Sequence, residues 1–264
     1  MDARLIVMRH GESTWTQKSV NRFAGWVDVP LTARGRDQAG QAGRLLSEAG
    51  LSPDLIFTSL LSRAIWTADI VLDLIDRAWI PVERTWRLNE RHYGAFQGET
   101  RPAMLERYGE EEFRAYRRSF DVRPPDIDLA SPYFQGDDPR YAPTMQDHLD
   151  TFDPAGIRAE CLKDLLIRLE PYWRARIAPA LRNGATVLVV THGSVVRALI
   201  KELEGVGDQD IASINVPTGV PMVYEFGTDV RGELRVKGKG RYLDPQAATK
   251  GMQETADLGR GAKG

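Results

Sequence analysis

The sequence predicts an α/β fold, and more narrowly a three-layer α/β/α sandwich around a mostly parallel central sheet. Short β-branched runs alternate with amphipathic stretches of helical length, and the 264 residues suffice for one large domain. The composition, 42% hydrophobic and 27% charged, is that of a globular protein. A mainly disordered chain is therefore excluded.

The first half of the chain follows the order strand, helix, strand, helix, strand. Strands are expected at residues 5–8, 55–58 and 81–83, because each run is rich in apolar residues and too short for a helix. Helices are expected to begin near Thr32, a favourable N-cap residue, and near Ser62. This order is typical of a parallel sheet with helices on both faces.

Residues from about 86 to 159 have a different character. Charged helical segments at 104–108 and 110–118 lead into a stretch rich in Pro and Asp at 124–154. A loop of this length inside a compact domain usually has a function. We predict a cap of helices and loops, inserted over the C-terminal edge of the sheet and belonging to a single domain of residues 1–243.

The α/β pattern then resumes and ends before a polar tail. The expected elements are helix 161–177, strand 186–191, helix 195–203 and two strands near a sheet edge, 222–226 and 234–237. The tail, residues 244–264, is rich in Gly, Ala and basic residues and is expected to be mobile.

Charge and apolar content exclude several classes of partner. Lys and Arg total 35 against 37 Asp and Glu, so no global charge favours nucleic acid or acidic membranes. No apolar stretch approaches the ~18 residues of a membrane span, and the first ten residues do not resemble a secretory signal. The single Cys161 cannot form an internal disulfide, which fits a cytoplasmic location.

Two predicted strands, far apart in sequence, both end in His-Gly. Ligands of open α/β sheets bind outside the carboxyl ends of the strands, so His10 and His192 are expected to meet over one crevice. Either histidine alone is weak support for a site, since such residues are often structural. The pair, with Arg9 beside the first, is much stronger.

The neighbouring arginines favour a phosphate site over a metal site. A metal would need a third ligand, and guanidinium groups repel cations, whereas arginine suits bidentate binding of phosphate oxygens. Arg9, Arg63 and His192 could surround a phosphoryl group beside His10. Positive surroundings lower the pKa of an imidazole, so His10 would be an uncharged nucleophile that forms a phosphohistidine.

Proton transfer would need a further group, for which Glu90 is the leading candidate. A carboxyl group in a partly closed pocket can act as general acid and base. The alternative is an exposed loop carboxylate paired with Arg91. Glu12 is a weaker candidate that could instead support Arg9.

Three arginines of the predicted cap, Arg114, Arg117 and Arg118, share one helix face. They form either a solvated surface or a binding site for a second anionic group of the substrate. Arg101 could serve the same purpose.

These residues resemble a known family. Arg9-His10-Gly11-Glu12 is similar to the signature of the histidine phosphatase superfamily, and the wider pattern resembles the cofactor-dependent phosphoglycerate mutases. The resemblance runs from Leu5 to about Phe226. The matching stretches are residues 23–29, 58–65, 88–94, 117–118, 138–141, 192–193, 197–199 and 217–221.

The resemblance implies interconversion of 3-phosphoglycerate and 2-phosphoglycerate in glycolysis and gluconeogenesis, primed by 2,3-bisphosphoglycerate and without a metal. His10 would carry the phosphoryl group, which Arg9, Arg63 and His192 would bind, and Glu90 would move the proton. Many members of the family are homodimers or homotetramers. The residues implied to bind the substrate are Ser13, Thr16, Ala24, Gly25, Arg91, His92, Tyr93, Arg101, Arg117, Arg118, Gly193 and Ser194.

The sequence departs from the family pattern at four substrate-side positions. Ser194 stands where Asn is usual, Ala24 replaces Thr, and Arg101 replaces Lys. The segment after Ser13 is two residues longer than usual, so the family's phosphate-binding Asn is either replaced by Thr16 or displaced. These changes keep open a phosphatase, or a mutase, of the same superfamily that acts on a different small phosphorylated metabolite. A non-catalytic phosphate-ester sensor is a third reading, although binding alone would not require a nucleophile and an acid/base group.

Overall fold

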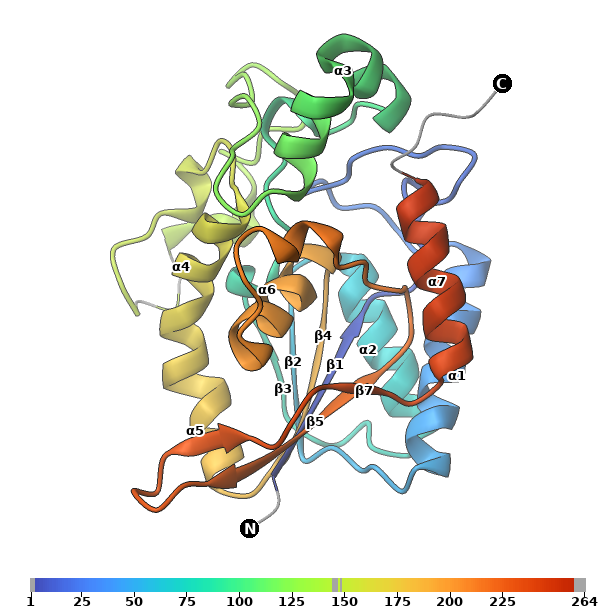
Figure 1. The fold of residues 1–264 in the computed structure, drawn as a ribbon, viewed down its shortest axis with the longest axis vertical. Helices are drawn as coiled ribbons and strands as arrows, with labels where there is room; N and C mark the ends of the chain where they lie inside the picture. The colour runs from blue at the N-terminus through green and yellow to red at the C-terminus, as the bar shows by residue number, and fades with distance from the viewer. Residues whose placement is uncertain (1–2, 144–146, 148, 259–264) are drawn as a thin grey trace.

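A mixed sheet forms the centre of the computed structural model, which describes residues 3–143, 147 and 149–258 (Figure 1). Its strands in chain order are β1 (Ala3–Arg9), β2 (Leu55–Thr58), β3 (Val82–Arg84), β4 (Thr186–Thr191), β5 (Met222–Thr228), β6 (Leu234–Val236) and β7 (Arg241–Tyr242). β3, β2, β4 and β1 lie parallel in that order, and β5 pairs antiparallel with β1, β6 and β7. The predicted strands and the parallel centre are confirmed, while β7 was not foreseen.

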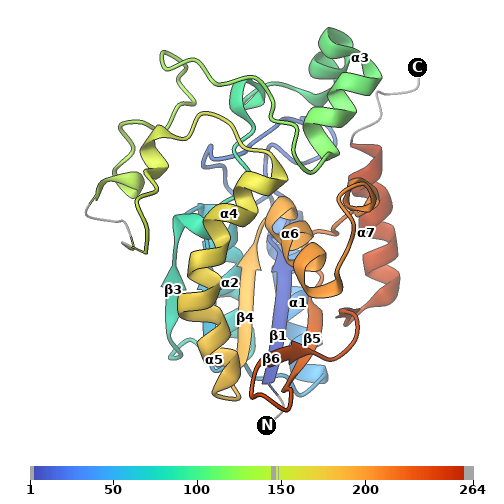
Figure 2. The ribbon, with the colours of Figure 1, turned by 60° about the vertical axis from the view of Figure 1, so that its left-hand side comes forward.

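Helices cover both faces of this sheet, which confirms the three-layer prediction (Figure 2). Successive residues of a strand point to opposite faces. Leu5 and Val7 of β1 accordingly join one core with α4 (Leu162–Tyr172), α5 (Ala178–Arg182) and α6 (Gly193–Glu204). Ile6 and Met8 join the other core with α1 (Ala33–Glu48) and α2 (Ser62–Leu74).

The turn after β1 packs directly against the start of α1. The Thr32 side chain caps this helix by accepting a 3.0 Å hydrogen bond from the Gly35 amide, as predicted. A Cβ atom on Gly11 would lie 2.1 Å from the carbonyl oxygen of Gly35, so no larger residue fits there. This close approach fixes the backbone that follows His10.

The predicted helix 161–177 is interrupted in the structure. α4 ends at Tyr172, and a π-helical turn, η6 (Trp173–Ile177), connects it to α5. Pro171 and Pro179 flank this turn. Because proline has no amide hydrogen to donate, Pro171 in the last turn of α4 and Pro179 at the start of α5 each remove one α-helical hydrogen bond next to this turn.

The cap lies over the carboxyl ends of the parallel strands (Figures 1 and 2). Its main helix, α3 (Arg101–Arg118), is broken at Gly109, whose φ of 72° is not helical; two helical segments were predicted here. The short helical turns around it and after α6 are η1 (Trp86–Leu88), η2 (Gly94–Phe96), η3 (Pro139–Tyr141), η5 (Pro154–Gly156) and η7 (Asp210–Ser213).

The tail differs from the prediction. Residues Pro245–Asp257 form a helix, α7, which Asp244 caps by accepting hydrogen bonds from the amides of Gln246 and Ala247. α7 lies beside α1, where Glu254 and Arg34 form a 2.7 Å ion pair (Figure 1). Most apolar side chains of this helix are alanines, with Met252 the one large exception, so no core pattern marks the helix in the sequence; Ala248 is nonetheless buried. Residues 259–264 of the predicted tail lie outside the described residues. Over the described ranges, no helix is long and apolar enough to cross a membrane.

Candidate active site

The structure brings His10 and His192 together, as the sequence predicted. β1 and β4 are neighbours in the centre of the sheet, with Arg9 opposite Thr191, and the His10 amide donates a 2.9 Å hydrogen bond to the Thr191 carbonyl. The two histidines follow the paired strand ends directly. Their ring centroids are 4.9 Å apart.

The surroundings of His10 determine which ring nitrogen is reactive. Its Nδ1 lies 2.6 Å from the carbonyl oxygen of Gly11. A carbonyl can only accept, so Nδ1 carries the hydrogen and Nε2 of the uncharged ring has a free lone pair. Burial, followed by the charges of Arg63 and Arg9, holds the pKa of His10 well below its usual range. His10 is therefore an uncharged imidazole with a nucleophilic Nε2.

His192 is packed beside His10 and fully buried. Its Nε2 is 2.8 Å from the Ser59 hydroxyl, and its Nδ1 has no hydrogen-bond partner among the described residues. Burial and the Arg63 charge also hold the pKa of His192 well below its usual range. The ring contacts His10 without lining the pocket described next.

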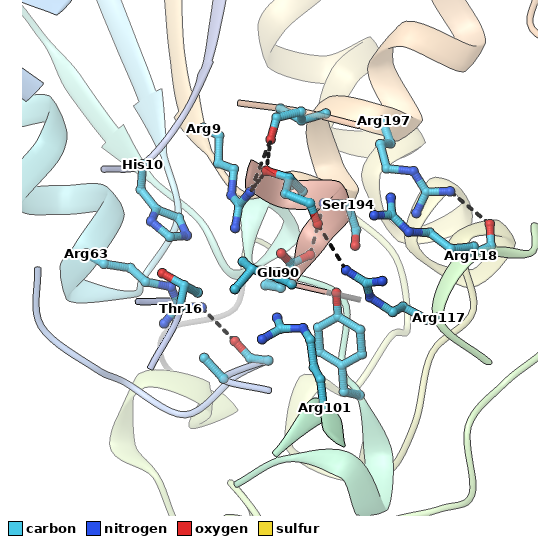
Figure 3. A pocket seen from close by; sticks show the side chains of 17 residues that line it. Arg9, His10, Thr16, Arg63, Glu90, Arg101, Arg117, Arg118, Ser194 and Arg197 are labelled. Atoms are coloured by element: carbon cyan, nitrogen blue, oxygen red, sulfur yellow. Dashed lines mark hydrogen bonds between the residues drawn. The ribbon is translucent and has the colours of Figure 1, made fainter. Parts of the chain in front are cut away.

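A pocket opens in front of His10, between the sheet, the cap and α7 (Figure 3). Figure 3 shows guanidinium groups from several elements directed toward the same space. The predicted site residues that line it are Arg9, His10, Thr16, Ala24, Gly25, Arg63, Glu90, Tyr93, Arg101, Arg117, Arg118, Gly193 and Ser194. The other lining residues are Arg197, Val216, Thr255 and Leu258.

The pocket is strongly positive. Its six arginines form no ion pair with a carboxylate within the described part of the chain; they are Arg9, Arg63, Arg101, Arg117, Arg118 and Arg197. Burial lowers the pKa of Arg63 and of Arg101 to about 10 and that of Arg197 to about 9, so all three remain charged at neutral pH. Buried charges without partners are costly. An anion with several negative charges would compensate them.

Arg63 is held at the edge of this pocket by the loop before α1. It donates hydrogen bonds to the carbonyl oxygens of Val27 (2.9 Å) and Gly25 (2.7 Å). Gly25 has a φ of 52°, and a Cβ atom there would lie 2.2 Å from Oε1 of Gln97. A glycine is therefore required for the loop to reach Arg63.

Glu90 is the one carboxylate among the described lining residues. Its Oε1 accepts hydrogen bonds from the amides of Arg91 (2.8 Å) and Ser194 (3.1 Å), and the residue is 8% exposed. The guanidinium of Arg91 instead donates to the carbonyls of Tyr116, Arg117 and Glu160. The alternative of an exposed carboxylate paired with Arg91 is therefore wrong.

The chain is similar to known proteins over almost its whole length. A family model described as the histidine phosphatase superfamily (branch 1) matches residues 5–133 and 130–235. A 2,3-bisphosphoglycerate-dependent phosphoglycerate mutase of a Nocardioides species is 50% identical over 260 residues, covering 98% of this chain and 100% of that protein. One from Corynebacterium kroppenstedtii is 48% identical over 258 residues, 98% of each chain. The chain belongs to the 2,3-bisphosphoglycerate-dependent phosphoglycerate mutase family.

Solved structures show the same fold at lower identity. Bacillus stearothermophilus YhfR aligns with a TM-score of 0.64 at 23% identity, covering 92% of this chain and 100% of that one. A mycobacterial glucosyl-3-phosphoglycerate phosphatase aligns with a TM-score of 0.62 at 22% identity, covering 89% and 98%. These likenesses concern the architecture alone.

All four positions that depart from the mutase family pattern face the pocket. Thr16, Ala24, Arg101 and Ser194 line it, and Thr16 and Arg101 are also fixed by nearby groups. The Thr16 hydroxyl is 3.0 Å from that of Ser13, and Arg101 donates to the side chain of Asn21. The departures therefore lie where they would contact a bound mutase substrate.

Three further residues predicted to bind substrate lie outside the pocket lining. Ser13 holds Thr16 through the contact just described, and Arg91 binds the carbonyls at the end of α3. His92 accepts a hydrogen bond from the Gly94 amide and donates one to Gln135, so both nitrogens of its ring are hydrogen-bonded within the cap. Glu12 does not support Arg9, as one alternative had it, but pairs with Arg34 at 3.1 Å.

The sequence left open whether the cap arginines form a solvated surface or a binding site, and the structure shows some of them in each environment. Arg114 is exposed, whereas Arg117 and Arg118 line the pocket. Arg118 donates to the Ile214 carbonyl and to Asn215. The helix face is thus solvated at one end and part of the pocket lining at the other.

Four lining residues were not predicted from the sequence. Arg197 follows Gly193 by one helical turn, so helical spacing could have placed it in the site. Thr255 and Leu258 lie in and just after α7, which was not predicted, and Val216 lies in a loop without a recognisable pattern. In the described part of the chain, no group of three or more His, Cys, Asp or Glu is arranged to hold a metal ion.

Proposed function

We propose that the protein interconverts 3-phosphoglycerate and 2-phosphoglycerate, with Nε2 of His10 as the phosphoryl carrier and 2,3-bisphosphoglycerate as the priming donor. The observation that carries this proposal is an uncharged His10 with a free Nε2 in a pocket of six arginines and one carboxylate. The names of relatives about 50% identical over nearly the whole chain support the same reaction.

The first step phosphorylates the enzyme. Nε2 attacks phosphorus in one ester of 2,3-bisphosphoglycerate, the N–P bond forms, and the ester P–O bond breaks. The departing oxygen takes a proton from the Glu90 carboxyl group, which becomes a carboxylate. The product is phosphohistidine and a monophosphoglycerate.

The second step reverses this chemistry at the other hydroxyl group. Glu90 removes the proton from a hydroxyl of the bound monophosphoglycerate, whose oxygen attacks the phosphorus held on His10. The N–P bond breaks and 2,3-bisphosphoglycerate forms again. Phosphorylation of His10 from its other ester then releases the isomer.

The arginines are proposed to work at two ends of the pocket. Arg9 and Arg63 act on His10 electrostatically and would stabilise charge on the transferred phosphoryl oxygens. Arg101, Arg117 and Arg118, from the cap, would bind the carboxylate and the second phosphate. Four to five negative charges on the donor would match the unpaired positive charge.

An assay of two products tests the proposal. Purified protein given 3-phosphoglycerate and catalytic 2,3-bisphosphoglycerate should form 2-phosphoglycerate faster than inorganic phosphate. Release of phosphate as the main product would instead identify a phosphatase. His10→Ala should fold normally and form no acid-labile phosphoenzyme, whereas persistent labelling would place the nucleophile elsewhere.

We further propose a cytoplasmic location, supported by the buried lone Cys161, which suits a reducing compartment. A homodimer or homotetramer stays a prediction from the family, and sedimentation of the purified protein would test it.

A further inference from the structure

The segment that carries Glu90 has an unusual support behind it. Residues 86–90 follow the short edge strand β3 and are bound to a single buried guanidinium on α4, that of Arg168. Arg168 donates hydrogen bonds to the carbonyls of Asn89 (2.9 Å) and Glu90 (3.1 Å). It also donates to the carbonyls of Trp86 and Arg87. One side chain thus holds four carbonyl groups within five residues.

Glu160 completes this support on the far side of Glu90. Its carboxylate accepts a 2.6 Å hydrogen bond from Nε of Arg168 and a 2.8 Å hydrogen bond from the His92 amide. Its own amide donates to the His92 carbonyl at 2.9 Å. Arg168 and Glu160 are both buried, so the pair fixes the backbone before and after Glu90.

The carboxyl group of Glu90 is fixed separately. Two backbone amides, those of Arg91 and Ser194, hold its Oε1, and its Oε2 accepts no hydrogen bond from the described residues. The indole of Trp26 adds a 2.6 Å hydrogen bond to the Glu90 carbonyl oxygen. The backbone is therefore held from behind while one carboxyl oxygen stays available on the pocket side.

We propose that Arg168, paired with Glu160, is a positioning residue for proton transfer by Glu90. The proposal rests on the function proposed above. A buried ion pair adds little net stability compared with apolar packing, so stability alone does not account for it. The N–H groups of Arg168 donate to the backbone around Glu90, the proposed acid/base group. A displacement of about 1 Å at a reacting group can lower the rate about 100-fold.

The role predicts a dependence on the leaving group. Phosphorylation of His10 by 2,3-bisphosphoglycerate breaks a P–O bond to an alkyl oxygen, which needs a proton from Glu90. Phosphorylation by p-nitrophenyl phosphate releases p-nitrophenolate, a stable anion that leaves without a proton. A displaced Glu90 should therefore slow the first reaction and spare the second.

Arg168→Lys is the central variant, since lysine keeps the charge beside Glu160 but cannot reach four carbonyls from one planar fork. We expect phosphohistidine formation from 2,3-bisphosphoglycerate, measured by rapid quench, to fall about 10- to 100-fold. The burst of p-nitrophenolate should stay within about threefold of wild type. Glu90→Gln should show the same selectivity with a larger loss, up to about 10⁴-fold.

Arg123→Lys is the matched control. Arg123 also forms a bidentate pair with a carboxylate on α4, donating to Asp164 at 2.6 Å twice, but it touches no part of the Glu90 segment. This control should match wild type with both donors. If Arg168→Lys does not fold, Trp26→Phe removes one hydrogen bond from the Glu90 carbonyl without changing any charge, and should show a smaller loss of the same kind.

The outcomes separate the two proposals. An equal loss with both phosphate donors, or no loss with either, overturns the positioning role of Arg168 and leaves the proposed function standing. Failure of the wild-type protein to form phosphohistidine from 2,3-bisphosphoglycerate overturns the proposed function itself. A loss confined to 2,3-bisphosphoglycerate in the Lys variant supports both.

Discussion

The two ends of the pocket are built in different ways. At the sheet end, Arg9 and His10 continue a central strand, and Arg63 lies in the first turn of α2. At the cap end, Arg117 and Arg118 come from the last turn of α3. The sheet end is fixed by backbone pairing, while the cap end depends on side-chain contacts between distant parts of the chain.

Those cap contacts involve Arg91, Arg197 of α6 and helix α7. Arg91 and Arg197 donate to the carbonyls of Arg117 and Arg118, the terminal carbonyls of α3 that have no helical partner. The Arg117 guanidinium in turn reaches the Thr255 carbonyl of α7 at 3.4 Å. We therefore propose that bonds are made and broken at the sheet end, whereas the cap end binds and encloses the substrate.

The largest expected effect comes from removing charge at the sheet end. Arg63→Met should lower kcat about 100- to 1000-fold, because a charge facing the transferred phosphoryl group is lost. The Arg63 charge lowers the pKa of His10, so its removal raises that pKa. The acid limb of phosphoenzyme formation should therefore move to higher pH, which a pH–rate profile measures.

Arg63→Lys separates charge from geometry at the same position. Lysine keeps the positive charge but loses the two fixed hydrogen bonds to Gly25 and Val27. The rate should fall while the acid limb stays near the wild-type pH. An acid limb that moves equally in both variants would show that the charge of Arg63 does not control His10.

A smaller effect is expected at the cap end. Arg117→Met should raise KM for 3-phosphoglycerate about 10- to 100-fold with a weaker effect on kcat, since a charged hydrogen bond to the ligand is worth about 1.5–3 kcal/mol. Steady-state kinetics measures both constants. Arg114→Met, on the same helix but exposed, is the control and should match wild type. A loss in kcat alone would remove the distinction between the two ends.

The difference between the sheet end and the cap end also explains which site residues could be predicted from the sequence. His10, His192 and Arg63 stand directly at the ends or starts of regular elements, and parallel strands bring such positions to one edge. Thr255 and Arg168 could not be found this way. Their roles come from hydrogen bonds to residues 78 to 246 positions away, and such partners leave no local pattern.

Helix α7 shows the limit most clearly. Its composition, rich in Ala and Gly, resembles that of a mobile tail. Its contacts with the pocket and with α1 include those of Thr255 and Glu254, polar residues that no core pattern marks. Arg91 and His92 show a different limit. The family resemblance implies that both bind substrate, whereas in the structure their side chains form hydrogen bonds within the protein and lie outside the pocket lining.

Deleting the chain after Tyr242 tests whether the cap end excludes water. Without α7, Thr255 and Leu258 no longer line the pocket. Hydrolysis of the phosphoenzyme should rise severalfold relative to transfer to 3-phosphoglycerate, measured as the ratio of phosphate to 2-phosphoglycerate formed. Lys250→Ala, an exposed change on α7, should leave this ratio unchanged. An unchanged ratio in the truncated protein would show that α7 is not part of the closure.

The smallest expected effect concerns the stability of the cap in acid. His92 accepts a hydrogen bond from the Gly94 amide through Nδ1, which requires an uncharged ring. Burial lowers the pKa of His92 to about 4, against about 6.5 in an unfolded chain. Below about pH 6.5 the unfolded state therefore binds the extra proton, and the free energy of unfolding falls with falling pH until about pH 4.

His92→Gln isolates this contribution, because glutamine does not titrate. Between pH 7 and pH 5 the wild-type protein should lose about 2 kcal/mol more than the variant, measured by urea unfolding at each pH. His10 and His192 titrate in both proteins and cancel in the comparison. Equal losses would show that folding does not hold the His92 ring uncharged over this pH range, and this histidine would then contribute nothing to the acid sensitivity of the protein.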